Sequence, residues 1–575
     1  MTETLSSQIV DESKIDEYFP MPSFRHQQRE VIQEIVRLIN SGYKYIVAEC
    51  PTGAGKSPIA VTIARLAEEG KAFYITTTKM LQDQIEADFS GVATLKGRNA
   101  YPCTAYANFE GKIKQWMPSA QFEEQVNKNT NCDEGYCKSI TNRSSCRLCL
   151  PSAEDKQTEK IEFPEGMLYS FCPYFDRLFK AINAQTASMN FNNFILHVNY
   201  GTKFGARRIL IIDEAHNTEA KLLDFLECTI SSHHIDTRVP ELSSAIEYVK
   251  WIQSINAIGI LKGKLDEATE SMNMRQMSTY EGLIKKYINM ILEVKEDPEG
   301  WVCEFEEDDR TSITKATLKP IFAHRAAKNF LFNSADIVVF LSATILNAKT
   351  FTKSLGIKDG EYAALRVGSN FPIENRPIIT DYAGRFVGGK AKMSDWIGKM
   401  VNKIEEIANR YEKHRGIIHT HSFEIQKAIT ERLSTKTRNR LTQQFDYQNK
   451  TDMIVAHGKK QSSIIIAPAM HEGVDLKDDL SRFQILCKVP FANFYDNKQL
   501  SARMEIDREY YDYITILKIV QSVGRSVRSE TDWADTYIID ESFERVYRNN
   551  VSSFPTWFKE SVITSQKWQK IQRTV

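Results

Sequence analysis

The sequence predicts an α/β protein with two lobes, the first of which is interrupted by two insertions. The segment 43–48 reads as a buried strand, and it is followed by a glycine-containing loop and by the helical pattern of 58–69. A second apolar strand, 208–212, ends in two carboxylates. Further along the chain, the runs 416–419 and 464–467 predict strands of a second lobe. Strand-sized apolar runs that alternate with helical patterns are typical of α/β folds.

The composition is that of an ordinary globular protein without an overall charge. The 575 residues are 42% hydrophobic and 26% charged, and their formal net charge is +0. This length predicts about three to five domains. Because the net charge is zero, a nucleic-acid partner would have to be bound by a local basic groove. No apolar run approaches the ~20 residues of a membrane helix, so we expect no membrane partner.

The loop after the first strand predicts a phosphate-binding site. It reads Cys-Pro-Thr-Gly-Ala-Gly-Lys-Ser from Cys50 to Ser57, and such a loop turns backbone N–H groups toward the phosphates of a nucleotide. Lys56 would reach the phosphates, and the Ser57 hydroxyl would bind Mg²⁺. Cys50 stands where the strict pattern has glycine, and the alternative is a chance glycine-rich turn. The predicted nucleotide-binding residues of the loop are Thr52, Gly53, Ala54, Gly55, Lys56 and Ser57.

The two carboxylates after the strand 208–212 predict the second half of this site. A carboxylate at the carboxyl end of a strand lies where open α/β sheets bind their ligands. Asp213 would hold Mg²⁺ through water, and Glu214 would orient and deprotonate an attacking water molecule. The alternative is an ordinary acidic turn at the end of a strand.

Four later segments resemble, in their order along the chain, the motifs of superfamily-2 helicases. Leu341–Thr344 is similar to motif III, and 416–422 is similar to the strand and turn that open a second RecA-like lobe. Glu472–Asp475 resembles motif V, and Gln521–Arg528 resembles motif VI. The resemblance implies two RecA-like P-loop lobes with ATP between them, and an ATP hydrolase coupled to DNA unwinding.

The same resemblance implies roles for single side chains. Arg525 and Arg528, with Gln521 beside them, would reach across the cleft and stabilise charge on the transferred phosphoryl group. Both arginines would lie on one helix face, and the alternative is a surface ion-pair cluster. The segment Arg25–Gln28 resembles the one that contacts the base of the nucleotide. The residues that the resemblance adds to the nucleotide site are Gln28, Gly473 and Asp475.

The first insertion contains six of the ten cysteines, between Cys103 and Cys172. The N-terminal residues 1–19 lack the apolar core of a signal peptide, so we expect a reducing compartment in which clustered cysteines favour metal over disulfides. The flanks 95–103 and 172–175 resemble the iron–sulfur helicases of the XPD/DinG family, in which four cysteines hold a [4Fe–4S] cluster. Four ligands are expected among Cys103, Cys137, Cys146, Cys149 and Cys172, and Cys132 is the least favoured of the six. A structural Zn²⁺ and a set of free buried thiols are the alternatives.

The second insertion, 220–330, reads as mostly helical. The resemblance implies an arch domain that closes around single-stranded DNA, and the alternative is a helical packing module without DNA contacts. The predicted domains are 1–95 for the first part of lobe 1, 96–180 for the iron–sulfur cluster domain, 181–225 for the second part of lobe 1 with the acidic box, 226–325 for the helical arch domain, 326–365 for the end of lobe 1 with motif III, and 366–575 for lobe 2 with motifs IV to VI.

The resemblance thus implies an ATP-dependent DNA helicase that moves 5′ to 3′ on single-stranded DNA. Its expected substrates are forked duplexes, D-loops, R-loops and RNA–DNA hybrids, with roles in DNA repair and replication. Two alternatives remain open: a nucleic-acid translocase or remodeller without general unwinding, and a P-loop scaffold that uses ATP as a switch. The expected cofactors are ATP, Mg²⁺ and the [4Fe–4S] cluster or Zn²⁺. We expect a monomer in the cytoplasm of a bacterial or phage-infected cell, associated with the nucleoid.

Overall fold

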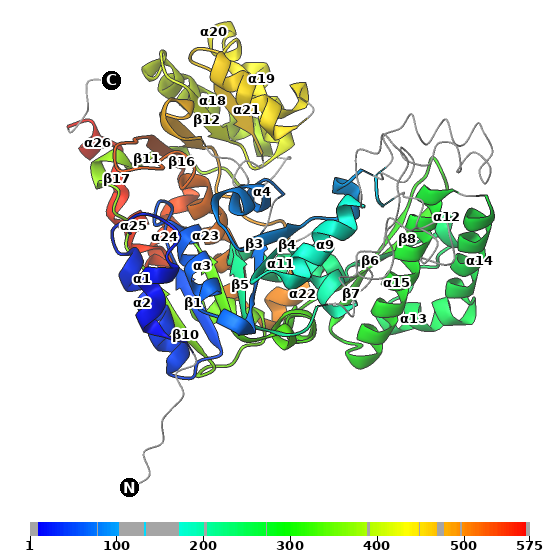
Figure 1. Cartoon of the computed structure of the whole chain (residues 1–575). Coiled ribbons are helices and arrows are strands. Elements are labelled where there is room, and N and C mark those ends of the chain that lie inside the picture. Colours follow the sequence, from blue (N-terminus) through cyan, green and yellow to red (C-terminus); the bar gives the residue numbers. More distant parts are fainter. Residues whose placement is uncertain are drawn as a thin grey trace, which may run out of the picture.

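The computed structural model describes residues 10–76, 79–102, 131–133, 172–200, 204–271, 273–387, 392–447, 449–468, 476–494 and 497–570. Within these ranges the chain forms two large sheets and one small sheet, each covered by helices (Figure 1). No helix in these ranges is long and apolar enough to cross a membrane.

The first lobe is built on a parallel sheet of seven strands in the order β10-β1-β9-β5-β2-β4-β3. Its central strands are continuous apolar runs because both faces of the sheet are buried under helices. The strands are β1 (Tyr45–Glu49), β2 (Ala72–Thr76), β3 (Val92–Leu95), β4 (Thr186–Asn190), β5 (Arg207–Asp213), β9 (Ala335–Ser342) and β10 (Tyr362–Arg366). This sheet confirms the predicted α/β class of the first lobe.

Helices lie on both faces of this sheet. Alternation along β1 places Ile46 and Ala48 in one core and Tyr45 and Val47 in the other. The first core is completed by α2 (Gln28–Asn40), α3 (Lys56–Arg65) and α4 (Lys79–Asp88). The second core is completed by α9 (Pro173–Asn183), α11 (Thr218–Leu226) and α17 (Ala348–Ser354).

The second lobe repeats this architecture and confirms the second α/β unit. Its seven strands are all parallel, in the order β13-β14-β12-β15-β16-β11-β17. The strands are β11 (Ile378–Gly384), β12 (Gly416–His419), β13 (Leu441–Gln443), β14 (Ile464–Ala467), β15 (Phe483–Leu486), β16 (Asp535–Asp540) and β17 (Val562–Thr564). The main helices are α18 (Met393–Arg410), α19 (Phe423–Arg432), α21 (Lys450–Lys459), α22 (Lys498–Ile506), α23 (Glu509–Val523), α24 (Ser542–Asn549) and α25 (Thr556–Ser561).

The second insertion is mostly helical, as the sequence predicts, but it also includes a small sheet that the sequence did not predict. It contains α12 (Ser232–Ile235), α13 (Ala245–Ser254), α14 (Ala257–Glu270) and α15 (Met274–Glu296). It also contains an antiparallel sheet of β6 (Cys228–Ser231), β8 (Thr314–Pro320) and β7 (Trp301–Glu307), which lies beside the helices in Figure 1. Buried positions recur at every second residue of β8, which is the pattern of a half-buried strand.

Helix α22 of the second lobe is attached to this module. The Gln499 side chain donates to the carbonyl oxygen of Pro320 at 2.6 Å, and the Lys498 ammonium donates to the carbonyl oxygen of Cys303 at 3.1 Å. Both carbonyls belong to the small antiparallel sheet. The module therefore contacts the second lobe directly, in addition to its covalent connections to the first.

Candidate functional site

The phosphate loop occupies the turn between β1 and α3, as the sequence predicts. Helix α3 begins at Lys56, so the N–H groups of its first turn face the loop. Gly53 and Gly55 have φ angles of 88° and 72°, which residues with a side chain rarely adopt. An added Cβ at Gly55 would also overlap the Gln28 amide, so a side chain there would displace Gln28 from the loop.

Gln28 is held directly against this loop. Its Nε2 donates to the carbonyl oxygen of Gly55 at 3.1 Å, while its Oε1 accepts the backbone N–H of Arg25 at 2.7 Å. The Arg25 guanidinium donates to the carbonyl oxygen of Gly53 at 3.3 Å. The structure thus brings the Arg25–Gln28 segment to the phosphate loop, although α2 and β1 separate the two along the chain.

Asp213 ends β5 at the same edge of the sheet. Its side chain is nearly inaccessible, and its Oδ1 accepts the backbone N–H of Glu214 at 2.9 Å. Burial raises the pKa of Asp213 to about 6, the charge of Glu214 adds to this effect, and Lys56 opposes it. The carboxylate therefore depends on nearby positive charge to stay ionised.

Two hydroxyl groups lie next to Asp213 and complete an oxygen-rich cluster. The Tyr74 hydroxyl donates to Asp213 Oδ2 at 3.2 Å, and the same phenol is hydrogen-bonded to the Ser57 hydroxyl. Carboxylate and hydroxyl oxygens are the ligands that Mg²⁺ prefers. Ser57 and Asp213 therefore fit the predicted role in holding Mg²⁺.

The pKa of Glu214 depends on charged side chains of both lobes. Its backbone lies in the left-handed region, with a φ of 50°. Burial would raise the pKa of its carboxyl, but the charges of Lys56, His216, Arg525 and Arg528 outweigh burial and hold the pKa below its usual range. Because Arg525 and Arg528 belong to the second lobe, the structure brings them to the acidic box of the first.

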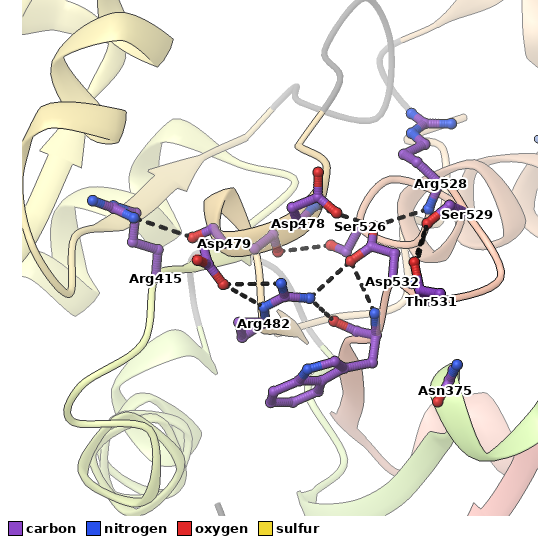
Figure 2. A network of polar contacts seen from close by, with 12 residues as sticks. Asn375, Arg415, Asp478, Asp479, Arg482, Ser526, Arg528, Ser529, Thr531 and Asp532 are labelled. Atoms are coloured by element: carbon purple, nitrogen blue, oxygen red, sulfur yellow. Dashed lines mark hydrogen bonds and ion pairs between the residues drawn. The ribbon is translucent and has the colours of Figure 1, made fainter.

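Arg525 and Arg528 follow the end of α23 at Val523, so they do not lie on one helix face as the sequence predicts. Figure 2 shows how the backbone of Arg528 is held. Asp532 is buried, and its Oδ2 accepts the backbone N–H groups of Arg528 at 3.0 Å and Asp478 at 3.2 Å. Its Oδ1 accepts from the Arg482 guanidinium at 2.8 Å. Gln521 lies inside α23, where its carbonyl oxygen accepts from Arg525 Nε at 3.2 Å. Asp532 was not singled out in the sequence, because an aspartate in a polar loop carries no distinctive signal.

A hydrogen-bonded bridge joins the acidic box to the predicted motif III. His216 Nδ1 lies 2.7 Å from the Ser342 hydroxyl and 3.3 Å from the Thr344 hydroxyl. The same ring lies 3.5 Å from the Glu214 carboxylate. One imidazole nitrogen therefore lies close both to the acidic box and to the hydroxyls at the end of β9.

Two of the six clustered cysteines lie in the described residues, and they touch each other. Cys172 precedes α9, and its Sγ lies 3.7 Å from Cys132 Sγ, with both side chains buried. Cys132 is the residue that the sequence favoured least as a ligand. Cys103, Cys137, Cys146 and Cys149 lie outside the described residues, as do Gly473 and Asp475.

A pair of adjacent thiols fits part of a cysteine-ligated metal centre, because thiolates bind both zinc and iron–sulfur clusters. The described ranges contain no group of three or more histidine, cysteine or acidic side chains placed to hold a metal ion. The pair therefore represents at most half of a four-cysteine site within the part of the chain that the structure describes.

Comparison with known proteins agrees with this architecture. The family model described as helicase C-terminal domain matches residues 404–561, and the model described as type III restriction enzyme, res subunit, matches residues 21–250. The ATP-dependent DNA helicase CHL1 of Candida albicans is 27% identical over 115 residues, which are 17% of this chain and 13% of that protein. The Fanconi anemia group J protein homolog of Gallus gallus is 23% identical over 125 residues, which are 19% of this chain and 10% of that protein.

Solved structures share the fold over nearly the whole chain. The structure named XPD_Helicase matches with a TM-score of 0.61 and 16% identity, over 95% of this chain and 100% of that one. The structure of S. tokodaii Xpd4 matches with a TM-score of 0.51 and 12% identity, over 94% and 100% of the two chains. The fold and the site define a two-lobed P-loop protein with a helicase C-terminal domain. The chain is similar in sequence to parts of curated DNA helicases, and its fold is similar to that of the solved XPD structures.

Proposed function

We propose that this protein is an ATP-dependent DNA helicase whose ATP site lies between its two lobes. One observation carries the proposal: Lys56 of the first lobe and Arg525 and Arg528 of the second act together on the pKa of Glu214. A carboxylate whose ionisation is favoured by positive charges of both lobes fits a phosphoryl-transfer site between the lobes.

Each of these side chains has a part in the proposed hydrolysis. Lys56 and the loop N–H groups hold the phosphates, and Mg²⁺, when bound by Ser57 and Asp213, would neutralise phosphate charge. Glu214, kept ionised by its neighbours, accepts a hydrogen bond from the attacking water and orients it. Arg525 and Arg528 stabilise the charge that develops on the transferred group, and this stabilisation draws the lobes together.

The imidazole of His216 connects the acidic box to the end of β9. Its Nδ1 lies near the Glu214 carboxylate and also near the hydroxyls of Ser342 and Thr344. Opening and closing of the cleft would thus move the end of β9 together with the acidic box. Such alternating movement of two lobes along one strand is the mechanism that we propose for translocation.

We further propose 5′-to-3′ movement on single-stranded DNA and unwinding of forked, D-loop, R-loop or RNA–DNA hybrid structures, by a monomer in the cytoplasm. Support comes from the family resemblance. The test is unwinding of forked, 5′-tailed and 3′-tailed duplexes and hybrids by the full chain. Unwinding of forked and 5′-tailed substrates, but not of 3′-tailed duplexes, is expected. ATP turnover stimulated by single-stranded DNA without unwinding would indicate a translocase, and unstimulated turnover would indicate a switch scaffold.

The cysteine segment is proposed to hold a [4Fe–4S] cluster with Cys172 among its ligands. Protein purified without oxygen should then contain about four irons per chain and absorb visible light. The contact of Cys132 with Cys172 also favours a second candidate, Zn²⁺. Two thiolates bound to one tetrahedral Zn²⁺ at about 2.3 Å would lie about 3.8 Å apart, close to the observed 3.7 Å. Colourless protein with one zinc per chain would support that candidate.

A further inference from the structure

The Tyr74 hydroxyl lies between the two residues that fit a role in holding Mg²⁺. Tyr74 is the central residue of β2, and its side chain is completely buried. The phenol donates to Asp213 Oδ2 at 3.2 Å and is hydrogen-bonded to the Ser57 hydroxyl. Strand β2 is the immediate neighbour of β5 in the sheet, so the contact is built into the strand order.

The proton of the phenol fixes the direction of these hydrogen bonds. A phenol has one proton to donate, and it goes to Asp213, so Ser57 must donate its own proton to the phenol oxygen. The other oxygen of Asp213 accepts the backbone N–H of Glu214 at 2.9 Å. Both carboxylate oxygens therefore have a fixed donor, and the plane of the carboxylate is set.

We infer that Tyr74 is a positioning residue for Mg²⁺, which holds the Ser57 hydroxyl and the Asp213 carboxylate at the spacing and orientation that the ion requires. The inference rests on the proposed ATP site. Mg²⁺ demands near-ideal octahedral geometry, so the placement of two ligands matters more for it than for larger ions. When the Ser57 oxygen uses a lone pair on the ion, its proton keeps an acceptor in the phenol, and no buried donor is left unpaired.

The ordinary alternative is a tyrosine that only fills the core. The ring of Tyr74 does pack in the core between the sheet and helices α2, α3 and α4. The ring of Tyr74 packs in the core, whereas its hydroxyl group makes the hydrogen bonds that would position Ser57 and Asp213. Tyr74→Phe keeps the ring and removes the oxygen, so this variant separates the two roles.

The experiment measures binding of a fluorescent ADP analogue to the full chain, in EDTA and across a Mg²⁺ titration, together with the melting temperature. Wild type is expected to bind more tightly with Mg²⁺. Tyr74→Phe should bind the nucleotide as well as wild type does in EDTA. The increase in affinity that Mg²⁺ causes should be about tenfold smaller than in wild type, which is the effect of one hydrogen bond to a charged group. Tyr287→Phe, a completely buried tyrosine of α15, is the matched control and should behave as wild type.

A double-mutant cycle with Ser57→Ala supplies the second measurement. If Tyr74 acts through Ser57, the two losses in Mg²⁺-linked affinity are not additive. Three results would each overturn the inference. The first is a Tyr74→Phe variant that gains as much affinity from Mg²⁺ as wild type. The second is an equal loss of affinity with and without Mg²⁺ at a lowered melting temperature, and the third is additive losses of affinity in the cycle. Failure of wild type to bind the nucleotide would instead overturn the proposed function.

Discussion

The Glu219 carboxylate of α11 lies 3.3 Å from the Arg503 guanidinium of α22, and both side chains are almost completely buried. The guanidinium also lies over the rings of Phe322 and Tyr510, at 4.1 Å and 4.5 Å from their centroids. Helix α11 begins a few residues after the acidic box, whereas α22 belongs to the second lobe. This ion pair therefore connects the catalytic segment of one lobe to the other lobe and, through Phe322, to the inserted module.

Glu219 should make stability depend on pH in a specific window. Burial raises the pKa of its carboxyl to about 7, although Arg503 opposes the rise. Because the folded-state pKa exceeds the ordinary value, the contribution to stability is present below about pH 4.5 and is lost as the pH rises through about 7. Glu219→Gln should remove this pH dependence, which amounts to about 3 kcal/mol in the free energy of unfolding. Melting temperatures between pH 5 and 8 measure it.

The matched control for this change is Glu431→Gln, an exposed glutamate of α19. It should leave the pH profile of wild type intact. A profile of Glu219→Gln that still follows wild type would contradict the role of this carboxyl.

Replacing Lys56 by alanine should lower the rate of ATP hydrolysis at least about 100-fold, because the phosphates lose their contact with a positive charge. The melting temperature should hardly change, since Lys56 is the first residue of α3 and is not in its core. Turnover of ATP with and without single-stranded DNA is the measurement. Lys436→Ala, a half-exposed surface lysine paired with Glu412, is the control, and retained turnover in Lys56→Ala would disprove the assigned phosphate loop.

Arg528→Ala should lower kcat by roughly 10³-fold with little change in ATP affinity, because its charge matters most in the transition state. Arg528→Lys should not restore the rate, since an ammonium lacks the planar fork of donors. Single-turnover hydrolysis separates the two parameters. The control is Arg548→Ala, an exposed arginine of α24, and a variant of Arg528 with the wild-type kcat would refute the assignment.

Asp532→Asn should lower kcat by about tenfold, because Asp532 accepts the backbone N–H of Arg528 and pairs with Arg482. If the aspartate acts by placing Arg528, the double variant with Arg528→Ala should be no slower than Arg528→Ala alone. Asp224→Asn, an exposed aspartate of α11, serves as the control. Additive losses in kcat would mean that Asp532 acts independently of the arginine.

Cys132→Ser and Cys172→Ser should each lower the metal content per chain, because their thiols lie 3.7 Å apart in one buried site. Metal analysis of protein prepared without oxygen is the measurement, and binding of ADP should remain because the ATP site is separate. Cys303→Ser, a cysteine of β7, is the control. Full metal content in Cys132→Ser would show that Cys132 is not a ligand and would favour the cysteines that the sequence predicts as ligands.

The sequence by itself determined the features that are encoded in contiguous residues. The phosphate loop, the carboxylates of Asp213 and Glu214, and the strands β1, β5, β12 and β14 follow from local backbone preferences and apolar periodicity, which neighbouring residues control. The small sheet of the inserted module was missed because its three strands are short and because β6 is separated from β7 and β8 by long helical segments. Periodicity predicted those helices but gave no pairing for the three strands.

Only the tertiary structure decided which distant side chains meet. It placed Tyr74 between Ser57 and Asp213, Cys132 beside Cys172, and Arg503 against Glu219. A tyrosine in a strand, a cysteine among six and an arginine in a helix have no distinctive local pattern. Their roles come from the order of strands in the sheet and from the docking of the lobes, which bring together residues that are far apart along the chain.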